Sequence, residues 1–210
     1  MSTPLDDPRA FADSRVEAMV EDLLAQIAID SRTGQERPYA DWLLARYADL
    51  GLQVAAHDLD DGRRNVLAWS GEGEDALVFS GHLDTVEPEM NLWKRSPWDA
   101  HVSDDGESVV GLGASDLKAS IVCATQATLA WKDSGRPGRV MMAWSFEEET
   151  TGDGTAALVP WAVEQGIWDP GHTSVIVTEP TGLDHLSIGN RGSVFYEVHV
   201  TGEGGHGSRP

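Results

Sequence analysis

Cysteine is almost absent from this sequence, which has one in 210 residues. Cys123 has no partner for an internal disulfide, so nothing in the composition indicates an oxidising compartment. It falls in an apolar helical stretch, where we expect a small buried residue. Long apolar runs are missing too: none approaches the roughly 20 residues of a membrane span. Residues 1–9 lack the apolar core of a signal peptide. We therefore expect a cytoplasmic protein that has no membrane partner.

Basic residues are also scarce. The chain has 15 Lys and Arg against 35 Asp and Glu, a formal net charge of −20. A field of this sign repels phosphate backbones, which argues against a nucleic-acid partner. Hydrophobic residues make up 40% of the chain, which is ordinary for a folded protein and argues against disorder. Most of the acidic residues are therefore expected on a solvated surface.

Several catalytic motifs are missing. The sequence has no G-x-S-x-G elbow, no phosphate-loop lysine motif and no H-E-x-x-H. Residues 202–207 match the spacing of a dinucleotide fingerprint, G-x-G-x-x-G, but Ser208-Arg209-Pro210 follows where a helix should open. A dinucleotide-dependent oxidoreductase is therefore only a remote alternative.

Short apolar segments alternate with helical patterns along most of the chain. Helices are predicted over 14–29, 36–49 and 155–165, and another from a cap at Ser115 to Trp131. Strands are predicted over 65–69, 76–80, 140–144 and 174–177. This alternation predicts an α/β fold with a mainly parallel sheet flanked by helices.

The pattern changes near Gly189. Residues 194–201 alternate between apolar and polar, as in a half-buried strand of an antiparallel sheet. We therefore predict one domain over 1–188 and the first strand of a second domain over 189–210. So few residues cannot bury a core of their own, and we expect the chain to be incomplete at its C-terminus.

Three of the predicted strands run directly into side chains that can bind metal. The first ends in His82 and Asp84, the second in Glu147-Glu148-Glu149, and the third in Glu179. Ligands of an open parallel sheet bind outside the carboxyl ends of its strands. Asp116, at the start of a predicted helix, is a fourth candidate. Carboxylates alone would favour calcium or magnesium, but His82 shifts the preference to zinc, manganese or cobalt.

These segments resemble the di-zinc aminoacylase and carboxypeptidase superfamily, which includes acetylornithine deacetylase, succinyl-diaminopimelate desuccinylase and glutamate carboxypeptidase. The resemblance spans residues 14–210. It rests on GHLDTV (81–86), the segment from Trp93 to Trp98, GLGASDLKAS (111–120), EEETTGDGT (147–155), VTEPT (177–181), GNRGS (189–193) and GGHGSRP (204–210). It implies a zinc-peptidase-like catalytic domain over 1–188 and the start of an α+β lid domain. The implied reaction is hydrolysis of the amide bond of N-acyl amino acids or small peptides.

The resemblance also assigns metal ligands. His82 and Glu179 match ligands of one zinc, Glu149 matches a ligand of the second zinc, and Asp116 matches the carboxylate that bridges the two ions. Cobalt or manganese could replace zinc. The last ligand of such sites is a histidine from a C-terminal segment that this chain lacks, so the chain itself could be inactive. Superfamily members also tend to have a non-proline cis peptide after the bridging aspartate, here Asp116–Leu117.

Three further residues match catalytic positions of the superfamily. Asp84 matches the carboxylate that orients the His82 imidazole. Glu148 matches the general base, which takes a proton from the bridging water and later gives it to the leaving amine. His206 resembles a lid-domain histidine that stabilises the oxyanion in the partner subunit, which implies a homodimer. The sequence departs from the usual pattern at Leu112, normally arginine, and at Glu147, normally aspartate. An inactive binding module of the same fold is the alternative function.

Overall fold

The computed structural model describes residues 3–182, 184–189, 196–199 and 201–202 of the chain. The chain divides into two units, Met1–Pro180 and Thr181–Pro210. All helices and strands of the described residues lie in the first unit. The helices are α1 (Pro8–Asp13), α2 (Val16–Ile27), α3 (Arg37–Asp49), α4 (Ala119–Ser134) and α5 (Asp153–Glu164). The strands of the main sheet are β1 (Gln53–Asp58), β2 (Arg64–Ser70), β3 (Ala76–His82), β6 (Arg139–Ser145) and β7 (Thr173–Val177). A separate two-stranded hairpin joins β4 (His101–Val102) to β5 (Val109–Val110).

The main sheet has the strand order β1-β2-β6-β3-β7. β3 pairs in parallel with both β6 and β7, and β2 pairs antiparallel with β1 and β6. Only β2 therefore runs against the other four strands. It does so because a tight turn over residues 59–63 joins it to β1 as a hairpin, which forces antiparallel pairing. The predicted α/β fold is confirmed as a mixed sheet flanked by helices.

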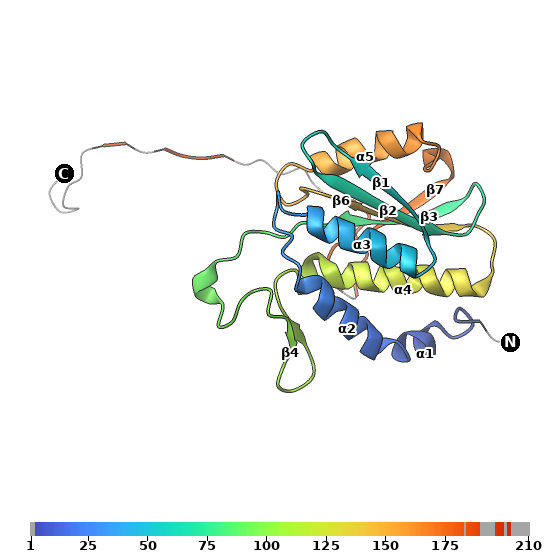
Figure 1. Ribbon diagram of the computed structural model, residues 1–210, viewed down its shortest axis with the longest axis horizontal. Helices are drawn as coiled ribbons and strands as arrows, with labels where there is room; N and C mark the ends of the chain where they lie inside the picture. Colours follow the sequence, from blue (N-terminus) through green and yellow to red (C-terminus); the bar gives the residue numbers. More distant parts are fainter. Residues whose placement is uncertain (1–2, 183, 190–195, 200, 203–210) are drawn as a thin grey trace. The chain divides into compact units, whose positions relative to one another are not determined.

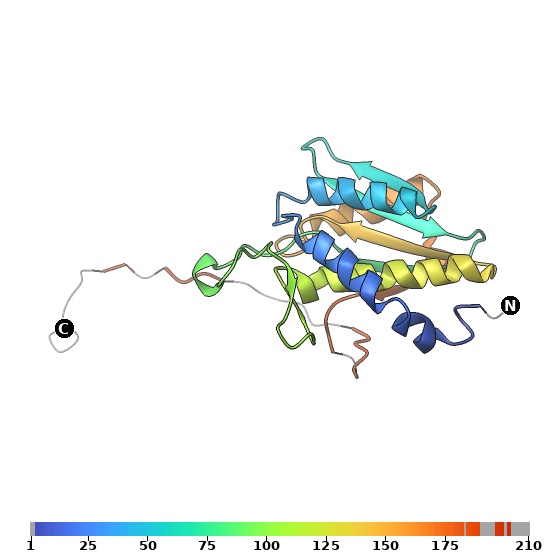
Figure 2. The same ribbon diagram turned by 60° about the horizontal axis from the view of Figure 1, so that its bottom comes forward.

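Helices cover both faces of the sheet (Figures 1 and 2). On one face, Tyr39 and Leu43 of α3 and Ile121 of α4 pack with Val66 and Trp144 of the sheet. On the other face, Leu158 and Ala162 of α5 pack with Leu67, Val78 and Met141. Neighbours such as Val66 and Leu67 point to opposite faces of the same strand. This two-sided burial explains why the central strands are continuously apolar.

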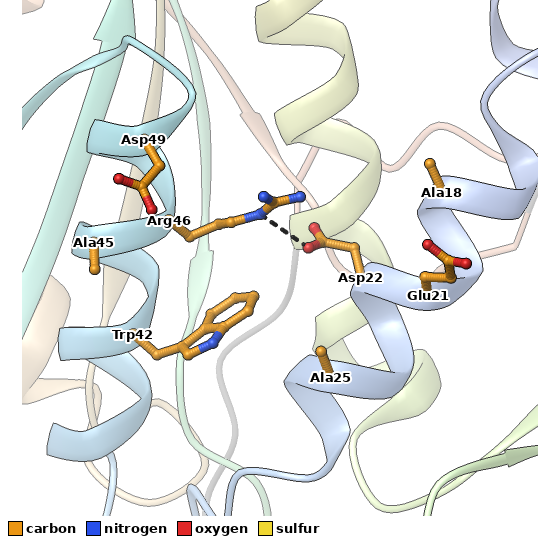
Figure 3. Close-up of a pocket in the computed structure, with 8 residues that line it drawn as sticks. All are labelled: Ala18, Glu21, Asp22, Ala25, Trp42, Ala45, Arg46 and Asp49. Carbon is orange, nitrogen blue, oxygen red and sulfur yellow. Dashed lines mark hydrogen bonds and ion pairs between the residues drawn. The ribbon is translucent and has the colours of Figure 1, made fainter.

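Helix α2 is attached to α3 by a polar network. Figure 3 shows the groove between the two helices, where Arg46 Nε lies 3.1 Å from Asp22 Oδ1. Asp22 Oδ2 also accepts a hydrogen bond from Gln26 Nε2 at 3.3 Å, and Gln26 Oε1 accepts one from Tyr39 Oη at 2.6 Å. Asp22 and Gln26 are both buried. The network fixes the C-terminal end of α2, which contacts the segment that carries Asp116.

Two local predictions are wrong. The helix predicted from Ser115 begins at Ala119, because Asp116 has extended backbone angles (φ −117°, ψ 92°) that a continuous α-helix cannot contain. Ala114–Lys118 instead forms a short, kinked helical segment. Cys123 is exposed rather than buried. It lies beside Val16 and Val20 in a shallow apolar groove between α2 and α4.

The second unit contributes little to the described part of the chain. Of the strand predicted over 194–201, residues 194, 195 and 200 lie outside the described residues, and 196–199 and 201 form no regular secondary structure. The domain boundary at residues 188/189 therefore stays a prediction. Within the described residues, no helix combines the length and apolar character needed to cross a bilayer.

Candidate metal centre

The side chains predicted to bind metal gather at the carboxyl edge of the sheet. His82 ends β3, and the chain leaves the neighbouring strands β6 and β7 toward Glu149 and Glu179. His82, Asp116 and Glu149 each offer a ligand atom within 4.8 Å of the other two. His82 Nε2 lies 3.0 Å from Asp116 Oδ1 and 3.9 Å from Glu179 Oε1. The structure therefore brings all four residues together, although they span nearly 100 positions of the sequence.

The chemistry of this donor set fits a divalent cation. His82 is 2% exposed, and its Nδ1 lies 2.9 Å from the backbone oxygen of Asp84. With Nδ1 engaged in this way, Nε2 faces the carboxylates as the free donor atom, which is the usual arrangement of a metal-binding histidine. One imidazole nitrogen among carboxylate oxygens suits zinc, manganese or cobalt.

Carboxylates outnumber positively charged groups in this cluster, and the pKa values of its members reflect this. Burial lowers the pKa of His82, but Asp84, Glu179 and Asp116 together raise that pKa to about 9. Burial raises the pKa of Glu149 and of Glu179, and the charge of Asp116 also raises both, although the charge of His82 acts in the opposite direction. Both carboxyls are thus harder to ionise than usual, first because they are partly buried and then because other carboxylates share the site. A bound cation would offset this repulsion.

Asp84 connects the imidazole to the acidic turn. Its carboxylate is buried, and Oδ1 lies 3.4 Å from His82 Nδ1. Oδ1 also accepts the backbone N–H of Glu148 at 3.0 Å, and Oδ2 accepts that of Glu149 at 3.2 Å. Burial alone would raise the pKa of Asp84, but hydrogen bonds with His82, the Glu148 N–H and the Thr33 hydroxyl lower it. The role in orienting His82 stays a prediction, and the structure adds a contact to the turn that carries the predicted base.

The segment around Asp116 is held by a buried lysine. Gly113, at φ 76°, begins the kinked segment, and the Asp116–Leu117 peptide is cis, as predicted. Two residues after Asp116, Lys118 Nζ donates to the backbone oxygens of Gln26 at 3.0 Å and Ile29 at 2.9 Å. Nζ also lies 4.6 Å from the centre of the Tyr39 ring. Burial lowers the pKa of Lys118 to about 7. The segment is thereby tied to the end of α2.

Comparison with known proteins identifies the family. The model of peptidase family M20/M25/M40 matches residues 78–208, more than half of the chain. The chain belongs to this family. It is 31% identical over 169 residues to acetylornithine deacetylase of Aliivibrio salmonicida, covering 77% of this chain and 40% of that protein. It is 35% identical over 156 residues to succinyl-diaminopimelate desuccinylase of Methylorubrum extorquens, covering 70% and 39%. The predicted superfamily is confirmed, and the chain spans about 40% of the length of these relatives.

Solved structures agree with the fold. An M20 family metallo-carboxypeptidase from Sulfolobus solfataricus superposes with a TM-score of 0.66 at 19% identity, covering 76% of this chain and 37% of that one. Human carnosine dipeptidase 1 superposes with a TM-score of 0.64 at 19% identity, covering 79% and 39%. The match therefore extends to the three-dimensional fold.

Two other predictions have different outcomes. His206 lies outside the described residues, so its role and the homodimer remain predictions. The dinucleotide alternative rested on residues 202–207, which fall within the segment matched by the M20 family model. Those glycines are thereby accounted for by the family, and the oxidoreductase alternative is not favoured.

Sequence reasoning missed three residues that support the M20-family site. Thr33 Oγ1 donates to Asp84 Oδ2 at 2.8 Å, and Glu36 Oε1 accepts the N–H of Glu147 at 3.3 Å. Arg63 pairs with the Glu147 carboxylate. The local sequence showed only that these polar residues lie between predicted elements or at the start of one. Their partners lie far along the chain, so no short-range pattern could reveal these contacts.

Proposed function

We propose that this protein is a metal-dependent hydrolase that cleaves the amide bond of N-acyl amino acids or small peptides. The observation that carries the proposal is the convergence of His82, Asp116 and Glu149 at one edge of an M20-family sheet. Glu179 and the acidic turn lie beside them. The acetyl and succinyl amides named for the two relatives are the first substrates to test.

The ions proposed are two zinc ions, with cobalt or manganese as substitutes. His82 and Glu179 would hold one ion, Glu149 the other, and Asp116 would contact both. When bound, such ions supply Lewis acidity and lower the pKa of a coordinated water. The raised pKa values of Glu149 and Glu179 support this assignment, since both carboxylates gain from a nearby cation.

Glu148 is the proposed proton carrier. Its backbone is fixed by Asp84, while its side chain is exposed and is not among the three converging ligands. A carboxylate in that position can take a proton from the attacking water and deliver it to the nitrogen of the leaving amine. Adjacent Glu149 is partly buried with the metal-binding group, so the two neighbours can serve different roles.

The remaining assignments are proposals of the same kind. His206 would stabilise the oxyanion in the site of a partner subunit, within a homodimer formed by the lid domain. The cytoplasmic location is likewise carried forward from the sequence. The competing function is a binding module that keeps the fold and binds the same substrates without cleaving them.

The test compares the zinc-loaded full-length wild-type protein with its Glu148→Ala variant on N-acetyl and N-succinyl amino acids. Wild-type protein should release the free amine, and the variant should lose at least about 100-fold in turnover while its metal content stays nearly unchanged. Loss of zinc together with activity would make Glu148 structural. Substrate binding by wild-type protein without release would favour the binding module.

A further inference from the structure

Glu147 adopts a backbone conformation that its side chain disfavours. Its φ is 56°, and it is the one residue other than glycine with positive φ in the described part of the chain. In this left-handed region, Cβ crowds the following carbonyl oxygen, so a residue stays there only when its surroundings hold it. Glu147 directly precedes Glu148 and Glu149. Its conformation therefore sets the direction in which both side chains leave β6.

Contacts from three segments hold Glu147 in place. Its N–H donates to Glu36 Oε1 at 3.3 Å, and its backbone oxygen accepts the N–H of Gly152 at 2.9 Å. Its carboxylate pairs with Arg63, whose guanidinium lies 4.3 Å from the centre of the Phe146 ring. The N–H, the carbonyl and the side chain of this residue are thus each engaged.

Glu36 is the deepest of these contacts. It is 2% exposed, and the same Oε1 atom accepts the N–H of Gly34 at 2.9 Å. A buried carboxylate is costly unless hydrogen bonds satisfy it. The loop that carries Glu36 also provides Thr33, which donates to Asp84. The loop before α3 therefore provides one of the two carboxylates that accept amides of the acidic turn and donates a hydrogen bond to the other.

The three contacts to the turn form a continuous set. Glu36 receives the N–H of Glu147, and the two oxygens of Asp84 receive the N–H groups of Glu148 and Glu149. Three successive amides are thus bound by two buried carboxylates. Asp84 accepts the amides of Glu148 and Glu149, whereas Glu36 is the one of these two carboxylates that accepts the amide of the strained residue Glu147.

We propose that Glu36 is a positioning residue that holds Glu147 in its left-handed conformation and so aims Glu148 and Glu149 at the metal centre. Its catalytic consequence rests on the proposed function, but its structural consequence does not. Without Glu36, the first amide of the turn loses its acceptor while the other two keep theirs.

The primary experiment measures amide hydrogen exchange at Glu147, Glu148 and Glu149 by NMR in the metal-free protein. In Glu36→Leu, exchange at Glu147 should accelerate about tenfold or more, because its part-buried N–H loses its acceptor. Exchange at Glu148 and Glu149 should change much less. Glu36→Gln should stay close to wild type, since its amide oxygen can accept both N–H groups. Gln35→Leu, the same change at the exposed neighbouring position, is the matched control.

A further variant of Glu36 separates the effect of side-chain length from the effect of its charge. Glu36→Asp keeps a buried carboxylate but withdraws it from Glu147 by one methylene, so it should behave like Glu36→Leu. It also serves if Glu36→Leu does not fold. Unchanged exchange at Glu147 in Glu36→Asp, or acceleration in Glu36→Gln as large as in Glu36→Asp, would overturn the proposal.

Zinc affinity and turnover supply the functional readouts. Calorimetry should show zinc binding at least about tenfold weaker in Glu36→Asp and nearly normal in Glu36→Gln. In Glu36→Asp, kcat should decrease while KM stays within a few-fold of the wild-type value. If the full-length wild-type protein cleaves no amide, the proposed function fails, while amide exchange and zinc affinity still decide the role of Glu36. Equal zinc affinity in wild-type protein, Glu36→Asp and Glu36→Gln would contradict the positioning role.

Discussion

The ammonium group of Lys118 donates to the backbone oxygen of Gln26 at 3.0 Å, across 92 positions of the sequence. This contact joins the end of α2 to the segment that presents Asp116. Tyr39 lies against the same ammonium and also binds the side chain of Gln26. The metal-binding edge of the sheet is therefore supported by helices that contribute no ligand themselves.

Replacement of Lys118 by methionine should destabilise the protein and weaken zinc binding together. The change leaves the part-buried Ile29 oxygen without its lysine donor, while the buried Gln26 oxygen keeps the Ile29 N–H at 3.2 Å, and this should cost about 1–3 kcal/mol of unfolding free energy. Urea unfolding measures this cost, and calorimetry measures the affinity for zinc. Lys132→Met is the matched control, because Lys132 donates to the Leu50 oxygen at 2.7 Å on the exposed surface. A loss in Lys132→Met as large as in Lys118→Met would contradict the argument from burial.

Asp116 should decide whether zinc binds at all. Wild-type protein is expected to retain one or two zinc ions per chain after reconstitution and dialysis, and Asp116→Ala to retain none. The reason is that Asp116 Oδ1 is the carboxylate oxygen nearest to His82 Nε2. Metal analysis by mass spectrometry gives the stoichiometry. Asp105→Ala, in the exposed β4–β5 turn, should keep the wild-type value, and zinc retained by Asp116→Ala would place the ion elsewhere.

Zinc binding should release a proton from His82. The raised pKa of about 9 means that the imidazole of the metal-free protein is charged at pH 7.5, and a charged imidazole cannot bind metal. Calorimetry in buffers of different ionisation enthalpy should therefore show about one proton released per zinc at this site. The released fraction should fall as the pH rises through about 9. A release that does not vary with pH between 7 and 10 would assign the proton to another group.

The sequence revealed the parts of this site that depend on local patterns. Apolar runs predicted β3, β6 and β7, and the side chains that follow them lie at the expected edge. β1 was not predicted, because Ala55, Ala56 and His57 carry little strand preference. The start of α4 was misplaced, since a capping serine gave no sign of the extended backbone at Asp116.

Long-range contacts explain most of what the sequence could not provide. Glu36 and Glu147 are 111 residues apart, and their hydrogen bond forms only after β6 is placed beside the N-terminal segment. Periodicity describes one element at a time, so it could not pair a loop before α3 with the turn after β6. The residues that support the site were missed for this reason, whereas the side chains predicted as ligands follow apolar strands and lie close together in the structure.

A close approach between α5 and β6 gives the last prediction. Gly154 lies so near the chain that a Cβ atom there would be 2.0 Å from the backbone oxygen of Phe146 and 2.7 Å from its nitrogen. Asn65 bridges the same two residues, accepting the Phe146 N–H and donating to the Gly154 oxygen, each at 3.1 Å. Gly154→Ala must therefore displace either the start of α5 or the residue before Glu147.

We expect Gly154→Ala to lower the unfolding free energy by about 3 kcal/mol or more, since backbone atoms cannot move aside as a side chain can. Zinc affinity should fall as well, because the displaced backbone leads directly into the acidic turn. Chemical denaturation and calorimetry measure the two effects. Ala156→Ser, at an exposed position of the same helix, should change stability by less than about 0.5 kcal/mol. Wild-type zinc affinity in a destabilised Gly154→Ala protein would show that the start of α5 moves while the acidic turn keeps its position.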